Sequence, residues 1–154
     1  MAFELTSTAF TQGADIPKPH TCDGPDRSPQ LAWSAPPSGT RAFALVCEDP
    51  DAPGGLWVHW VLWGIPGATT ALPEGVKSQP TLPDGSRHGK NDFGELGYNG
   101  PCPPRGAPHR YFWKLYALDA APVLEPGATR QQLLDAMKGH TLATTELMGR
   151  YGRP

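Results

Sequence analysis

Two short segments of the chain concentrate the side chains that could do chemistry. The first, Asp49 to Trp60, holds two carboxylates, a turn rich in Pro and Gly, and His59. The second, Gly97 to Tyr111, is a Gly/Pro-rich loop that ends in His109, an arginine and a tyrosine. Histidine, phenol and backbone N–H groups can all donate hydrogen bonds to phosphate oxygens. The same groups serve general acid–base catalysis, so these residue types fit an anion pocket or an enzyme.

Apolar stretches frame both segments. Residues 42–47, 57–65 and 111–118 are rich in apolar, β-branched and aromatic side chains, which is typical of buried strands. Alternate side chains of a strand share a face, which predicts two shared faces: Trp57 with His59, Val61 and Trp63, and His109 with Tyr111 and Trp113. If both strands belong to one sheet, His59, His109 and the Tyr111 hydroxyl converge at one mouth. The two carboxylates, Asp49 and Asp51, would then enter from the turn.

The remaining elements are shorter or weaker. We expect strands at 3–10, 30–33 and 142–151, and a short edge strand near Gly75–Lys77 inside the otherwise irregular stretch from Pro66 to His109. One helix is predicted at 129–138, where Thr129 and Gln132 fit a capping box and Gly139 is a C-terminal stop. The pattern predicts a mainly β fold, an antiparallel Greek-key β-sandwich with one or two short peripheral helices. The length of 154 residues predicts a single domain, residues 1–154.

Composition excludes several classes of protein. A formal net charge of -2, with Lys and Arg scattered along the chain, argues against nucleic-acid binding. No stretch approaches the ~20 apolar residues of a membrane span, and the N-terminus lacks the basic start and apolar block of a signal peptide. We therefore expect a soluble, cytoplasmic protein that is not an integral membrane protein.

The three cysteines do not form a metal motif or a disulfide framework. Cys47 lies in an apolar stretch and is predicted to be a core residue. Cys22 and Cys102 lie in loops beside the candidate site and could approach one another. In the cytosol the expectation is a reduced pair, and a disulfide would require an oxidising compartment. No third ligand stands at motif spacing beside the two histidines, so we predict no metal and no cofactor.

Structural interpretations compete with the functional ones. The Asp-Pro-Asp segment is also simple turn chemistry, and a single histidine on an apolar strand is often a core residue. On this interpretation Asp51 holds the turn through backbone N–H groups, while Arg110, on the opposite face from His109, is a structural ion-pair partner. Trp57, Trp60 and Trp63 are expected to be mainly core. No nucleophile elbow and no phosphate-binding P-loop sequence occurs.

Several motifs together resemble one known family, the phosphatidylethanolamine-binding proteins, also called the Raf kinase inhibitor family. They are Asp49–Pro53, Trp57–Trp60, Gly100–Pro104 and His109–Tyr111. Three further segments are similar to its bacterial and archaeal branch: Thr21–Gly24, Ser28–Trp33 and Asn91–Gly94. The similarity covers nearly the whole chain in order.

The resemblance implies a β-sandwich with a small pocket for phosphate, phosphorylated head groups or acetate-like anions. Carried over residue by residue, that pocket consists of Asp49, Pro53, His59, the backbone of Cys102, Pro103 and Pro104, His109 and Tyr111. Asp51, from the turn, completes the predicted binding site, and no residue is predicted to be catalytic. The last predicted strand is followed closely by Pro154, so we expect no counterpart of the C-terminal helix that covers the pocket mouth in eukaryotic members.

These inferences predict a non-enzymatic binding protein for a small anionic or phosphorylated ligand. His59 and His109 would donate to the anion, Tyr111 would add a hydroxyl, and Asp49 would orient a histidine or accept from a ligand amine. A regulatory role toward a kinase or protease partner, and a homodimer, are implied by the resemblance. Two alternatives stay open: a small hydrolase that uses the His/Asp pocket, and a pure protein-interaction module.

Overall fold

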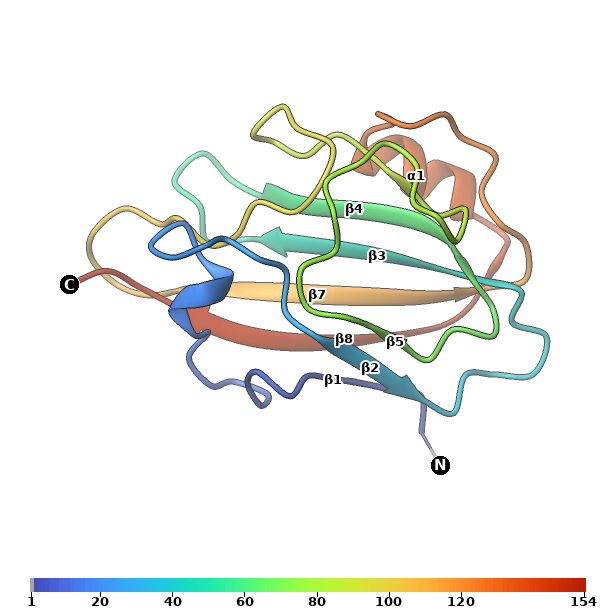
Figure 1. The fold of residues 1–154 in the computed structure, drawn as a ribbon, viewed down its shortest axis with the longest axis horizontal. Helices are drawn as coiled ribbons and strands as arrows, with labels where there is room; N and C mark the ends of the chain where they lie inside the picture. The colour runs from blue at the N-terminus through green and yellow to red at the C-terminus, as the bar shows by residue number, and fades with distance from the viewer. Residues whose placement is uncertain (1) are drawn as a thin grey trace.

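The computed structural model describes residues 2–154, which form two β-sheets, one α-helix and one 3-10 helix (Figure 1). The strands are β1 (Glu4–Thr6), β2 (Leu31–Ser34), β3 (Ala42–Asp49), β4 (Trp57–Pro66), β5 (Ala71–Leu72), β6 (Arg87–His88), β7 (His109–Leu118) and β8 (Thr141–Tyr151). The α-helix α1 spans Arg130–Met137, and the 3-10 helix η1 spans Lys18–His20. No helix within residues 2–154 is long and apolar enough to cross a membrane.

The two sheets have different sizes and are both antiparallel. The smaller sheet has the order β1-β2-β5, and the larger has the order β6-β4-β3-β7-β8. In the larger sheet β3, β4 and β6 are successive neighbours, and the chain then returns so that β7 lies on the other side of β3. This arrangement is the Greek-key connection that the sequence predicts. Figure 1 shows the smaller sheet lying across one face of the larger one.

The main core lies between the sheets, and a second apolar cluster lies under α1. The main core includes Leu31 and Trp33 of β2 and the large side chains Phe43, Trp60 and Trp113 of the larger sheet. The second cluster occupies the other face of the larger sheet: Ala44, Val46, Val58, Val61, Trp63, Leu118, Ala128, Leu133 and Met137. Strand β3 is therefore buried on both faces along its whole length, which explains its nearly continuous apolar sequence.

Strand β4 contains an irregularity that changes which side chains share a face. Cys47 of β3 pairs with Trp60, and Glu48 pairs with Val58, so His59 is an extra residue without a partner on β3. An extra residue of this kind is a β-bulge, which breaks the strict alternation of faces. Trp60 belongs to the core between the sheets, whereas Val61 belongs to the cluster under α1. The expectation that Val61 and Trp63 share the face of His59 is therefore wrong.

Other predicted elements are confirmed or shortened. The capping box at Thr129 is present, with the Thr129 hydroxyl accepting from the Gln132 backbone N–H and the Gln132 side chain accepting in return. The expected strand at 3–10 is limited to β1, because beyond it Ser7 bonds to the Gln30 carbonyl through its hydroxyl and the chain bends at residues 8–9. The predicted edge strand at 75–77 is wrong, since the residues that pair with β2 are 71–72 of β5.

Candidate functional site

The site lies at one end of the larger sheet, where three neighbouring strands begin or end. Strand β3 ends at Asp49, which pairs with Trp57 at the start of β4. Strand β7, on the other side of β3, begins at His109. Because these neighbours are antiparallel, the end of β3 and the starts of β4 and β7 lie at the same end of the sheet (Figure 1). The two segments singled out in the sequence therefore come together in space.

A cavity of about 460 Å³ opens at this end of the sheet. Its lining residues are Asp49, Ala52, Pro53, Gly54, Gly55, Leu56, Trp57, His59, Asp92, Phe93, Cys102, Pro103, Pro104, His109 and Tyr111. Every predicted site residue except Asp51 belongs to this lining. A larger hollow of about 640 Å³ lies beside it, between α1 and the 90–94 loop, but neither histidine contributes to its wall. The smaller cavity is the one that Asp49, His59 and His109 line together.

Asp49 is buried and fully engaged by hydrogen bonds. Its Oδ1 accepts from the backbone N–H of Asp51 at 2.7 Å, which closes the turn after β3. Its Oδ2 lies 2.7 Å from Nδ1 of His109, which donates to it. This bond fixes the orientation of the His109 ring and leaves Nε2 as the nitrogen free to meet a ligand. Asp49 thus connects the turn of the first segment to the histidine of the second.

His59 has a different partner. Its Nδ1 lies 2.7 Å from the backbone carbonyl oxygen of Asn99, and a carbonyl oxygen can only accept, so Nδ1 carries the hydrogen. Burial lowers the pKa of His59, and the Asn99 carbonyl and the Asp49 charge oppose that effect only in part. The ring is therefore neutral near pH 7, and its Nε2 is a hydrogen-bond acceptor. The prediction that His59 donates to an anion would therefore require its protonated form.

Tyr111 lies between the two histidines. Its ring centroid is 5.3 Å from that of His59, edge to face, and 6.4 Å from that of His109. Burial raises the pKa of the Tyr111 hydroxyl, and the negative charge of Asp49 raises it further. The phenol therefore keeps its proton throughout the physiological range and remains a hydrogen-bond donor.

A polar side chain outside the predicted binding site holds the loop beside the cavity. Asn91 is buried, and its Nδ2 donates to the Gly97 carbonyl at 3.0 Å and to Oδ1 of Asn99 at 2.7 Å. Its Oδ1 accepts from the backbone N–H groups of Phe93 and Glu95, both at 3.0 Å. Asn91 therefore positions both the cavity residue Phe93 and the carbonyl that orients His59. The only sequence signal for this role was membership in the Asn91–Gly94 motif.

Asp51 lies beside the cavity, outside its lining. Its carboxylate accepts from the backbone N–H, Nε and Nη2 of Arg110, each at 2.9 Å. These bonds lower the pKa of Asp51 to about 2. The prediction that Arg110 is an ion-pair partner is confirmed. Asp49, which is predicted to face the ligand, also accepts the bond that closes the turn. Asp51, which is predicted to hold the turn, holds the start of β7 instead.

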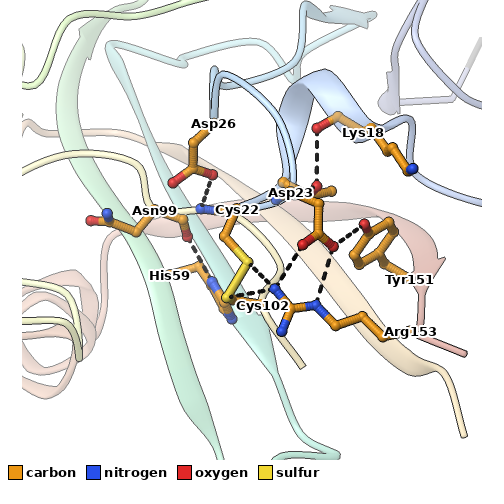
Figure 2. The surroundings of a disulfide bond; sticks show 11 residues. Lys18, Cys22, Asp23, Asp26, His59, Asn99, Cys102, Tyr151 and Arg153 are labelled. Atoms are coloured by element: carbon orange, nitrogen blue, oxygen red, sulfur yellow. Dashed lines mark hydrogen bonds and ion pairs between the residues drawn. A yellow bond between two sulfur atoms is a disulfide. The ribbon is translucent and has the colours of Figure 1, made fainter. Parts of the chain in front are cut away.

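The wall at Cys102–Pro104 is fastened by a disulfide between Cys102 and Cys22, whose Cα atoms are 5.4 Å apart. The expected reduced pair is therefore wrong for this structure: two loops that are distant in sequence pack against each other beside β7. Figure 2 shows the guanidinium of Arg153 against this disulfide, with its Nη2 2.8 Å from Sγ of Cys22 and 2.8 Å from Oδ1 of Asp23. Tyr151 donates its hydroxyl hydrogen to the same Asp23 carboxylate.

The mouth of the cavity is apolar. Leu56, Trp57 and Phe93 expose 40%, 39% and 41% of their surface, and the rings of Trp57 and Phe93 meet edge to face at 5.5 Å. Trp60 and Trp63 are core residues as predicted, but the same expectation for Trp57 is wrong, because Trp57 lies at the strand end where the sheet stops covering it.

The cavity has little positive charge to offer. No Lys or Arg belongs to its lining, which contains the carboxylates of Asp49 and Asp92 and the imidazoles of His59 and His109. Asp92 accepts a hydrogen bond from the backbone N–H of Val58 at 2.7 Å. The only cation that this lining can provide is therefore a protonated histidine.

The fold and the site define a class: a two-sheet β protein with a small polar cavity at one end of its larger sheet. Comparisons with known proteins agree with the fold. The family model described as "Phosphatidylethanolamine-binding protein" matches residues 6–152. The chain therefore belongs to the phosphatidylethanolamine-binding protein family, as its motifs suggest.

Relatives and solved structures cover the chain almost completely. A UPF0098 protein of Methanothermobacter thermautotrophicus is 50% identical over 149 residues, which is 97% of this chain and 98% of the relative. The crystal structure of a putative phosphatidylethanolamine-binding protein homolog, CT736 of Chlamydia trachomatis, has a TM-score of 0.89 and 42% identity over 99% of both chains. The structure of YbcL of Escherichia coli, described as a member of the mammalian family, has a TM-score of 0.93 and 34% identity over 100% of both chains.

Proposed function

We propose that the chain is a binding protein whose cavity takes phosphate or a small phosphorylated head group. One observation carries the proposal: the Asp49–His109 pair, His59 and the Tyr111 phenol all line one open cavity of about 460 Å³. A histidine held by a buried carboxylate is a donor when protonated, and the phenol is a second donor, as phosphate oxygens require. Family membership supports a binding role of this kind.

The apolar mouth favours a second candidate role, contact with a partner protein. Leu56, Trp57 and Phe93 are among the few large apolar side chains that the described part of the chain exposes, and they gather at the cavity. Aromatic residues are enriched at protein interfaces. In a regulatory role, these three apolar side chains at the mouth would contact the kinase or protease, and the ligand would bind deeper in the cavity.

A hydrolase is the weaker alternative. The thiol of Cys47 is buried, burial raises its pKa well above the usual value, and Cys102 is held in the disulfide. The described lining contains no serine, threonine or lysine that could serve as a nucleophile.

The cytoplasmic location stays a prediction, and the disulfide counts against it. Disulfides persist mainly in oxidising compartments, and thermophile interiors are the main exception. The Cys22–Cys102 pair therefore favours an oxidising environment for this chain.

A thermal-shift titration with phosphate, phosphoethanolamine and acetate tests the proposal. We expect phosphate and phosphoethanolamine to stabilise the wild type, and His59→Ala and His109→Ala each to abolish that stabilisation while the protein stays folded. His140→Ala is the matched control, because His140 pairs with Asp119 and does not line the cavity. Equal stabilisation of the wild type and both cavity variants would refute the assignment of the pocket.

A further inference from the structure

The two histidines of the cavity present opposite hydrogen-bonding character to a ligand. Nδ1 of His109 donates to a carboxylate, Oδ2 of Asp49, at 2.7 Å. Nδ1 of His59 donates to a neutral backbone carbonyl, that of Asn99, also at 2.7 Å. Because Nδ1 of His109 is committed to Asp49, Nε2 of His109 can donate to a ligand only in the imidazolium form. A carbonyl partner gives an imidazolium no charge compensation, so Nε2 of His59 keeps its lone pair and accepts.

The groups around His59 reinforce this difference. Asp49 faces it from β3, His109 and Tyr111 face it from β7, and Asp92 faces it from the 90–94 loop. Asp51 is neutralised by Arg110, and Cys102 is in an uncharged disulfide. Burial in this surrounding lowers the pKa of His59.

The charges of the lining disfavour a dianion. When His109 is protonated, two carboxylates face one imidazolium, and no Lys or Arg contributes. A second negative charge on the ligand would find no cation to pair with, and like charges in a partly desolvated site repel. A proton placed between the ligand and His59 removes that charge and also supplies the donor that Nε2 lacks.

Building on the anion pocket proposed above, we propose that the cavity selects a phosphomonoester in its singly protonated form. One phosphate oxygen accepts from Nε2–H of His109, while the acidic proton lies between a second phosphate oxygen and Nε2 of His59. No covalent bond between heavy atoms forms or breaks. A ligand that arrives as the monoanion brings this proton, and a ligand that arrives as the dianion takes it from solvent.

This arrangement has two consequences for affinity. Phosphomonoesters lose their second proton with a pKa of about 6, so binding above that pH takes up at least one proton and weakens by at least about tenfold per pH unit. Where His109 is neutral, it must take up a further proton before its Nε2 can donate. A phosphodiester has the same single charge at pH 5.5 but no proton to give to His59. Methyl phosphate and dimethyl phosphate therefore form a matched pair of probes, and they separate a free monoester from the diester linkage of an intact phospholipid head group.

The first experiment uses the wild-type protein alone. Isothermal titration calorimetry at pH 5.5 should show methyl phosphate binding at least about tenfold more tightly than dimethyl phosphate, since one hydrogen bond to a charged ligand distinguishes them. Equal affinities would overturn the proposal and leave the anion pocket standing. No binding of either probe at any pH from 5.5 to 8 would overturn this proposal and the anion pocket together.

The second experiment counts protons. Methyl phosphate is titrated at pH 8 into the wild type, His59→Gln and His140→Gln, each in two buffers of different ionisation enthalpy. The side-chain amide introduced by His59→Gln can donate directly to a dianion, so we expect this variant to take up about one proton fewer than the wild type. His140→Gln, whose histidine pairs with Asp119 away from the cavity, should match the wild type. The same uptake in all three proteins would refute the role of His59.

Discussion

At the scale of single residues, the site depends on which partner each polar side chain has. Asp49 joins the turn after β3 to His109, whereas Asp51, two positions later, faces outward to Arg110. The sequence places both carboxylates in one turn and predicts both as ligand residues. Their division of roles depends on the side of the strand end that each one faces, and residue types alone do not reveal it.

Asp51→Asn should change the pH dependence of stability and leave phosphate binding intact. The folded-state pKa of Asp51 is about 2, below its unfolded value of about 3.9. A depressed pKa means that the carboxylate stabilises the fold above about pH 4 and that this stabilisation is lost as pH falls toward 2. Both partners are partly exposed, at 49% for Arg110 and 30% for Asp51, so screening limits the effect to at most about 1 kcal/mol.

Urea unfolding of the wild type and Asp51→Asn at pH 6 and pH 2.5 measures this contribution. The variant should be less stable at pH 6, and the difference should shrink at pH 2.5. A difference that grows on acidification would contradict the assigned ion pair. A loss of phosphate binding in Asp51→Asn would show that Asp51 takes part in the binding site.

At the scale of elements, the bulge at His59 decides the geometry of the cavity. It allows His59 and Trp60 to face the same side of the larger sheet, so that the histidine borders the cavity while the tryptophan fills the core. Strict alternation along the strand predicts the face of His59 correctly but fails beyond it. A bulge depends on pairing with β3, so the sequence of β4 alone does not reveal it.

The capped helix is a different case, because its signals are local. Thr129, Gln132 and the apolar Leu133 and Met137 predict its start and its buried face, and all are found in those roles. The loops around the cavity depend on long-range contacts instead. Asn91 organises its loop by donating to the carbonyl of Gly97 and the side chain of Asn99, and no local sequence pattern predicts these bonds.

Thr129→Ala tests whether α1 only covers the sheet. It removes the hydroxyl that accepts from the Gln132 N–H at 3.1 Å, so we expect a loss of about 1 kcal/mol in the free energy of unfolding. Gln131→Ala, on the exposed side of the same helix, should change stability by less than about 0.5 kcal/mol. Both variants should bind phosphate as the wild type does. Weaker binding in Thr129→Ala at unchanged stability would show that the helix takes part in the site.

At the scale of the whole molecule, the sheets and the core can be predicted from the sequence, whereas the disulfide that joins two distant loops cannot. The number of apolar strands, their turns and the single helix predict the β-sandwich. The Cys22–Cys102 disulfide joins positions 80 residues apart, and only the folded structure brings their loops together beside β7 (Figure 2).

Removing this disulfide should destabilise the whole fold. A cross-link that closes a loop of this length restricts the unfolded chain, and its loss in Cys22→Ser/Cys102→Ser should lower the free energy of unfolding by about 2–5 kcal/mol. Chemical denaturation with and without a reductant measures the effect. The reductant should destabilise the wild type and leave the double variant unchanged, because Cys47 is buried and free. Equal stability of the oxidised wild type and the double variant would show that the bond contributes nothing.

The central claim is that one end of the larger sheet binds a phosphate group through His59 and His109. Nitrogen NMR of the five histidine side chains, recorded during a phosphate titration at pH 6, tests it most directly. We predict that the ring signals of His59 and His109 shift together and saturate, while those of His20, His88 and His140 stay in place. Unmoved signals of His59 and His109, or shifts confined to the other three, would contradict the claim.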